Sequence, residues 1–109
     1  MPPANLGELE QLVLLAIARL GEDAYGVAVR KQIATRTRRE LSFGSVYTAL
    51  TRLEAKGLVA SRLGEPTAER GGRRKKHYTI SAAGRRALQR SLNAIRTMAR
   101  GIDASWGTP

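Results

Sequence analysis

The sequence has no cysteine, a single histidine (His77) and few aromatic side chains, 5% of its 109 residues. Disulfide bonds, thiolate metal sites and cysteine nucleophiles are therefore excluded, and one histidine cannot build a histidine-rich metal site. Long apolar runs are also absent. The longest, residues 12–18, is too short to cross a bilayer, so we expect no membrane span.

Acidic side chains are scarce as well, because 19 Lys and Arg residues stand against 9 Asp and Glu, for a net charge of +10. The excess is local. Residues 62–90 hold 9 basic and 2 acidic side chains, which accounts for +7 of the total, whereas residues 1–61 are nearly balanced. So concentrated a surplus favours a polyanionic partner, and nucleic acid is the first candidate.

Groups that could perform catalysis are missing too. The carboxylates occur singly or in exposed pairs at expected helix ends, with no spacing that would bring them together in a pocket. We therefore expect no enzyme, no cofactor and no metal site. Residues 1–5 lack the basic start of a signal peptide, so we expect a flexible leader on a cytoplasmic protein.

The apolar pattern predicts helices over the first half of the chain. Residues 6–20 repeat leucine, valine and isoleucine at steps of three and four, which is the helical period, and Gly21 ends this helix. A second helix is expected over residues 24–35, with Asp23 as its N-cap.

A third helix is expected from Phe43 to about Lys56, with Ser42 as its N-cap. Its inward face is apolar. Its outward face is small, hydroxylic and cationic, and carries Ser45, Thr48, Thr51, Arg52 and Ala55. Such a face can approach another molecule closely.

The segment that follows predicts a β-hairpin with a basic tip. Residues 58–63 and 75–80 alternate apolar and polar side chains, as strands do, and residues 64–72 are rich in turn formers. We interpret His77 as an ordinary strand residue. Ser81 is expected to cap a last helix that reaches about residue 101 or beyond.

Short helices, a tight turn, a capped third helix and a basic hairpin form the pattern of a winged helix-turn-helix, a mainly α fold with one small hairpin. In this fold the third helix enters the DNA major groove and the hairpin, or wing, contacts phosphates. Hydroxyl and cationic side chains suit both tasks. We therefore expect DNA contacts from Ser45, Thr48, Thr51, Arg52, Arg73, Arg74, Lys75 and Lys76.

At these positions the chain resembles the PadR family of bacterial transcriptional regulators. The stretches that carry the resemblance are residues 25–26, 42–47, 50–59 and 71–84, in the same order and with similar spacing. The resemblance implies a dimeric DNA-binding repressor, often released by a small molecule. It also adds Tyr47 and the early hydroxyls of the third helix, Ser42 among them, to the DNA contacts.

The chain departs from the family pattern at two positions. Phe43 stands where the family often has proline, and His77 replaces a common aromatic residue of the wing. Phe43 leaves the fold unchanged, because either residue suits the first helical turn, but it bears on base preference.

The last helix carries an apolar seam at steps of four and three, the spacing that packs one helix against another. Its residues are Leu88, Leu92, Ile95, Ala99, Ile102 and Trp106. One interpretation is that the seam covers the domain's own core. We favour a homodimer interface, and an effector pocket would then lie at that interface.

The expected organisation is a leader (1–5), a winged helix-turn-helix domain (6–80), a dimerisation helix (81–106) and a tail (107–109). We expect a regulator that binds double-stranded DNA, a repressor acting as a homodimer on a pseudo-palindromic operator. The alternative is a basic nucleoid or RNA-binding protein without sequence preference. A winged domain used only for protein contacts is disfavoured by the basic wing.

Overall fold

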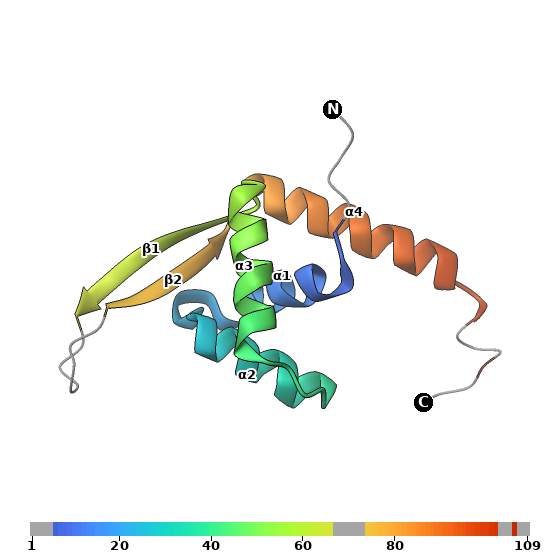
Figure 1. The fold of residues 1–109 in the computed structure, drawn as a ribbon. Helices are drawn as coiled ribbons and strands as arrows, with labels where there is room; N and C mark the ends of the chain where they lie inside the picture. Colours follow the sequence, from blue (N-terminus) through green and yellow to red (C-terminus); the bar gives the residue numbers. More distant parts are fainter. Residues whose placement is uncertain (1–5, 67–73, 103–105, 107–109) are drawn as a thin grey trace.

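Three helices, a two-stranded hairpin and a long final helix follow one another along the chain (Figure 1). The structure is a computed structural model that describes residues 6–66, 74–102 and 106. The helices and strands it describes are α1 (Glu8–Leu20), a 3₁₀ turn η1 (Gly21–Asp23), α2 (Gly26–Thr37), α3 (Phe43–Ala55), β1 (Val59–Pro66), β2 (Arg74–Ile80) and α4 (Ala82–Ala99). The predicted leader, tail and central part of the hairpin tip lie outside the described residues.

The core forms around α1, which packs against α2, α3, β2 and α4. Leucine, valine and isoleucine side chains at the predicted helical spacing supply most of it, and each stabilises the fold by about 1.5–3 kcal/mol relative to an exposed position. The most deeply buried of them are Val13, Leu14, Val29, Val46, Leu50 and Leu53. The predicted inward face of the third helix is thereby confirmed.

Two of the three predicted helix caps are confirmed. The hydroxyl oxygen of Ser42 accepts a hydrogen bond from the Ser45 N–H at 3.0 Å, and that of Ser81 accepts one from the Gly84 N–H at 3.0 Å. The prediction for Asp23 is wrong, because the 3₁₀ turn uses this residue and its carbonyl accepts the Tyr25 N–H at 2.9 Å. The second helix therefore starts later than predicted, at the residue after Tyr25, and no side chain caps it.

The predicted hairpin is present as an antiparallel pair. Val59 lies opposite Ile80, and the register shifts after the pair of Leu63 and Lys76. Near its base the hairpin joins the helical core, since Tyr78 is buried. The wing is therefore anchored at one end and projects away from the helices at the other (Figure 1).

The start of α4 is packed tightly against the turn that follows α3. The Ser81 hydroxyl donates to the Gly57 carbonyl at 2.7 Å, and the Ser81 N–H donates to the Leu58 carbonyl at 3.1 Å. A Cβ at Gly84 would overlap that same Leu58 carbonyl. Only glycine allows the helix to approach so closely.

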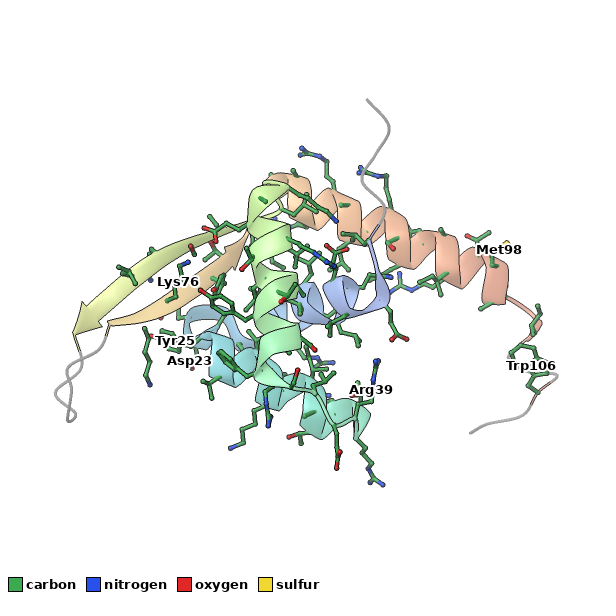
Figure 2. All side chains as sticks on the ribbon, in the orientation of Figure 1. Asp23, Tyr25, Arg39, Lys76, Met98 and Trp106 are labelled. Carbon is green, nitrogen blue, oxygen red and sulfur yellow. The ribbon has the colours of Figure 1, made fainter. Side chains whose placement is uncertain are left out.

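The far half of α4 extends beyond the three-helix core, and Figure 2 shows Met98 and Trp106 at that end. The helix is shorter than predicted. It ends at Ala99 because Arg100 is extended and Gly101 has a φ of 86°, a left-handed conformation that suits glycine. The predicted seam is therefore interrupted before Ile102.

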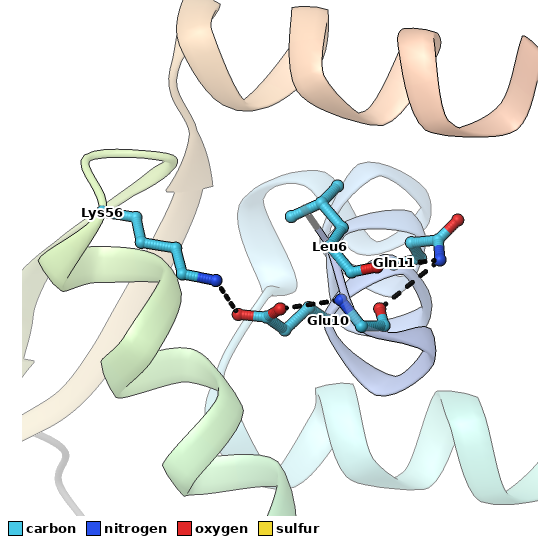
Figure 3. A network of polar contacts seen from close by, with 5 residues as sticks. Leu6, Glu10, Gln11 and Lys56 are labelled. Carbon is cyan, nitrogen blue, oxygen red and sulfur yellow. Dashed lines mark hydrogen bonds and ion pairs between the residues drawn. The ribbon is translucent and has the colours of Figure 1, made fainter. Parts of the chain in front are cut away.

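An ion pair links the start of α1 to the end of α3 (Figure 3). Lys56, just after α3, donates to a carboxylate oxygen of Glu10 in α1 at 2.8 Å, and the Gly7 N–H donates to the other oxygen at 2.9 Å. Burial alone would raise the pKa of Glu10. The hydrogen bonds from Lys56 and Gly7, with the charges of Lys56 and Arg52, outweigh it and hold that pKa below its ordinary value of 4.5.

We predict that Glu10→Gln lowers the free energy of unfolding by about 1 kcal/mol at pH 7, because it removes a charge-assisted hydrogen bond from a partly exposed lysine. A carboxylate with a lowered pKa stabilises the fold above its unfolded-state value. The difference from wild type is therefore complete at neutral pH and shrinks as the pH falls below 4.5.

Urea denaturation between pH 7 and pH 3 measures this difference. The matched control is Glu8→Gln, in the same turn of α1 as Glu10. It removes an exposed carboxylate that pairs with Arg39, and we expect it to change the free energy of unfolding little. A Glu10→Gln difference that stays constant down to pH 3 would contradict the assignment.

Candidate nucleic-acid interface

The outward face of α3 carries the side chains that the sequence predicts there. Because Val46, Leu50 and Leu53 are seated in the core, the opposite side of the helix faces solvent. The exposed residues on it include Ser42 at the N-cap, Ser45, Tyr47, Thr48, Thr51, Arg52 and Ala55. The structure thus brings the six predicted contact residues of this segment together on one side of the domain.

Several of the predicted hydroxyls are already hydrogen-bonded within the helix. The Ser42 hydroxyl donates to the Ser45 hydroxyl oxygen at 2.8 Å, and the Thr51 hydroxyl donates to the Tyr47 carbonyl at 3.0 Å. These two groups keep lone pairs that can accept from a ligand, but their donors are occupied. Among the described residues, none is hydrogen-bonded to the Thr48 side chain.

The wing places exposed lysines next to α3. The Lys76 ammonium lies 4.0 Å from a carboxylate oxygen of Glu54, and the other oxygen of Glu54 accepts from the Ser61 hydroxyl at 2.5 Å. The Lys75 ammonium lies 5.5 Å from the centre of the Tyr25 ring, within cation–π range. Arg73, also predicted as a contact, lies outside the described residues, and Arg74 is described only as backbone in β2.

His77 attaches the wing to the start of α2. His77 is 4% exposed, and its ring packs edge-on against the Tyr25 ring with a centroid distance of 5.6 Å. The backbones of the two residues form an isolated β-bridge. The next residue continues the contact, because the Tyr78 N–H donates to the Ala24 carbonyl at 2.9 Å. Sequence reasoning missed this buried position, since a histidine in a basic strand carries no signal of burial.

The same region keeps the Tyr78 hydroxyl neutral. Burial, with added contributions from Tyr47 and Glu54, raises the pKa of Tyr78 to about 12. Tyr78 therefore adds no negative charge at physiological pH, and Glu54 is the acidic group that lies near Lys76. Figure 2 shows Tyr25 and Lys76 between the hairpin and the helices, where the wing and the α3 face adjoin.

An apolar feature of this face was also missed. Phe43 and Tyr47 are both partly exposed, and their rings stack at a centroid distance of 6.0 Å with planes 26° apart. Val27 of α2 is an exposed apolar residue as well. The sequence did contain a signal for this exposed ring. Phe43 is the first residue of α3 and does not share the spacing of the inward-facing residues Val46, Leu50 and Leu53.

The predicted seam of α4 divides into two parts. Leu88 is only 7% exposed and packs within its own chain, and Leu92 is half-buried against the core, so the first part of the seam covers the domain's own core. Ile95, Ala99, Ile102 and Trp106 instead line a shallow hollow of about 440 Å³ together with Ala94 and Met98.

The described residues contain no group of three or more His, Asp or Glu side chains that could hold a metal ion. In the same part of the chain, no helix has both the length and the apolar character of a membrane span.

The sequence match identifies the family. The model of the transcriptional regulator PadR-like family matches residues 13–90, most of the chain. The chain belongs to this family. PadR-like proteins are transcriptional regulators and not enzymes, as predicted, and the match covers α3, the hairpin and the first half of α4.

Solved structures support the fold of this PadR-like regulator. A PadR family transcription regulator from hypervirulent Clostridium difficile is 26% identical with a TM-score of 0.71, and the match covers 93% of this chain and all of that one. A PadR family regulator from Eggerthella lenta is 28% identical with a TM-score of 0.68, over 94% and 88% of the two chains.

A PadR-like regulator from Bacillus cereus is 22% identical, with a TM-score of 0.72 over 93% of each chain, and so bears on the fold alone. No curated protein matches the chain. The predicted winged helix fold of the PadR-like chain is confirmed.

We predict that Ser42→Ala lowers the free energy of unfolding by about 1 kcal/mol, because the first turn of α3 loses its capping oxygen. Urea denaturation measures the change. Ser42→Asp is the matched variant, since aspartate caps a helix as well as serine does, and it is expected to keep wild-type stability. Equal losses in both variants would show that the cap contributes nothing.

Proposed function

We propose that this PadR-like regulator binds DNA in a sequence-specific manner and represses transcription as a homodimer on a pseudo-palindromic operator. The observation that carries the proposal is the exposed face of α3 beside the lysines of the wing. Side chains such as Thr48 and Arg52 are of the kind that reach base edges and phosphates. The proposed DNA contacts are Ser42, Ser45, Tyr47, Thr48, Thr51, Arg52, Arg73, Arg74, Lys75 and Lys76.

The division of charge supports separate roles for the two elements. Residues 62–90 hold +7 of the net charge of +10, and this segment includes the wing. Wing cations would neutralise phosphates whatever the sequence. The outward face of α3 has one cation, Arg52, so sequence discrimination would depend on its hydroxyl and aromatic groups.

The test of this proposal is selection of bound fragments from random double-stranded DNA, followed by a salt titration of the selected fragment. Recovery of a palindromic sequence is expected. Fragments with no shared sequence would favour the alternative function, a nucleoid protein that binds without sequence preference, and preferential binding of RNA would favour the RNA-binding alternative.

The dimer part of the proposal places the contact at the far end of α4. Ile95, Met98, Ile102 and Trp106 are exposed there around one apolar hollow. An exposed apolar surface of this kind favours burial against another copy of the helix. Two α3 helices could then lie about one DNA turn apart, roughly 34 Å, over the two halves of an operator.

Release by a small-molecule effector is a further part of the proposal. The hollow at the end of α4 supports it, since dimerisation there would enclose an apolar space lined by Trp106 and Met98.

A repressor acts where the DNA lies, so we also propose a cytoplasmic location.

We predict that Lys75→Ala with Lys76→Ala weakens binding to all DNA sequences alike. Each lost phosphate contact should reduce the slope of log K against log salt by about one unit. Fluorescence anisotropy at several salt concentrations measures the slope. The charge-preserving pair Lys75→Arg and Lys76→Arg is the control and should keep it. An unchanged slope in the alanine variant would show that these lysines do not contact DNA phosphates.

We predict that Ile95→Glu converts the dimer into monomers, because it buries a charge in the proposed apolar contact. Light scattering measures the mass. Thr97→Glu adds the same charge to an exposed position of α4 outside the hollow and should leave the dimer intact. A dimer that persists in Ile95→Glu would place the contact elsewhere.

A further inference from the structure

The face proposed to meet DNA contains an apolar surface at the start of α3. Phe43 is 43% exposed, Tyr47 is 44% exposed, and the neighbouring Val27 at the start of α2 is 69% exposed. We refer to these three residues as the aromatic patch. Exposed apolar groups are unfavourable in a polar interface unless they meet an apolar group of the partner.

The Phe43 ring is held in a defined position. It lies over Gly26, where an added Cβ would come within 3.4 Å of the end of the ring. The Phe43 ring also stacks on the Tyr47 ring of the same helix, with a centroid distance of 6.0 Å. The Phe43 ring therefore packs against both helices, and part of it stays exposed to solvent.

Hydrogen bonds within α3 occupy the donors of two of the hydroxyl groups that could otherwise recognise a base. The donors of Ser42 and Thr51 are used by Ser45 and by the Tyr47 carbonyl. Beside the Thr48 side chain, the aromatic patch adds an exposed apolar surface to what this helix offers to a base edge. In the major groove the distinctive apolar group is the 5-methyl group of thymine.

The charges around the patch favour DNA over a protein as its partner. Tyr25, next to Gly26, lies under the Lys75 ammonium, and Arg52 is exposed further along α3. A second copy of this chain, with its net charge of +10, would be repelled from a basic surface. A duplex would be attracted to the same surface through its phosphates.

We infer that Phe43, stacked on Tyr47, recognises the 5-methyl group of a thymine in each half of the operator. The inference rests on the proposed function, since it requires that α3 enter the major groove. It assigns part of the base selectivity to an aromatic residue at the first position of the helix, beside the proposed contacts of the hydroxyl face.

The test replaces single thymines of the selected fragment by deoxyuridine, which removes the methyl group and keeps every hydrogen-bonding atom. The wild-type protein is expected to bind about fourfold more weakly when the recognised thymine of one half-site is replaced, the effect of one buried methyl group. Replacement of thymines outside the protected region is the control and should change nothing.

Two variants assign the effect to a residue. Phe43→Ala should bind the thymine and deoxyuridine fragments equally well. Thr48→Ser, which removes a methyl group from the same face and keeps the hydroxyl, should retain the fourfold difference. If Phe43→Ala does not fold by circular dichroism, Phe43→Leu takes its place, and its smaller side chain should reduce the difference.

The outcomes separate this inference from the proposed function. Failure to select any fragment overturns both. A selected operator that binds equally well with deoxyuridine at every thymine overturns the inference and leaves the proposed function intact. Discrimination that disappears in Thr48→Ser and persists in Phe43→Ala assigns the methyl contact to Thr48. A change of mass in Phe43→Ala, with methyl discrimination retained, makes the patch a protein contact.

Discussion

Burial of the inner face of α3 against the other helices is the interaction on which the rest of the molecule depends. Val46, Leu50 and Leu53 have no exposed surface, so α3 can rotate about its axis only by breaking the core. Their burial determines which side chains face outward. The proposed functional face is thus a consequence of packing, and Thr48 or Arg52 needs no contact of its own to be presented there.

The wing depends on a second set of contacts, made by β2 with the segment before α2. The edge-on rings of Tyr25 and His77 and the hydrogen bond from Tyr78 to Ala24 hold the base of the hairpin. Because α2 also packs against α3, the base of the wing and α3 belong to one packed unit. In the proposed function, a charged wing in this position would add attraction to DNA without determining the base preference.

Local signals predicted much of this arrangement. Apolar spacing located the helices and their buried faces, and serine at positions 42 and 81 located two helix starts, because both signals depend on neighbours in the sequence. The burial of His77 and the division of the α4 seam depend on residues distant in the chain. Leu88 and Ile95 repeat at the same helical spacing, yet only the packing of α4 on α1 separates the buried residue from the exposed one.

The contact of Gly84 with the Leu58 carbonyl, together with the packing of Leu88 and Leu92 on the core, fixes the first half of α4 to the winged domain. A helix of 18 residues is about 27 Å long, so a rotation of the whole domain by about 5° displaces the far end of α4 by about 2 Å. The reverse also holds. In the proposed homodimer, a small change in how the far ends of the two α4 helices cross would rotate each whole winged domain. The spacing of the two α3 helices would then change without any rearrangement inside either domain.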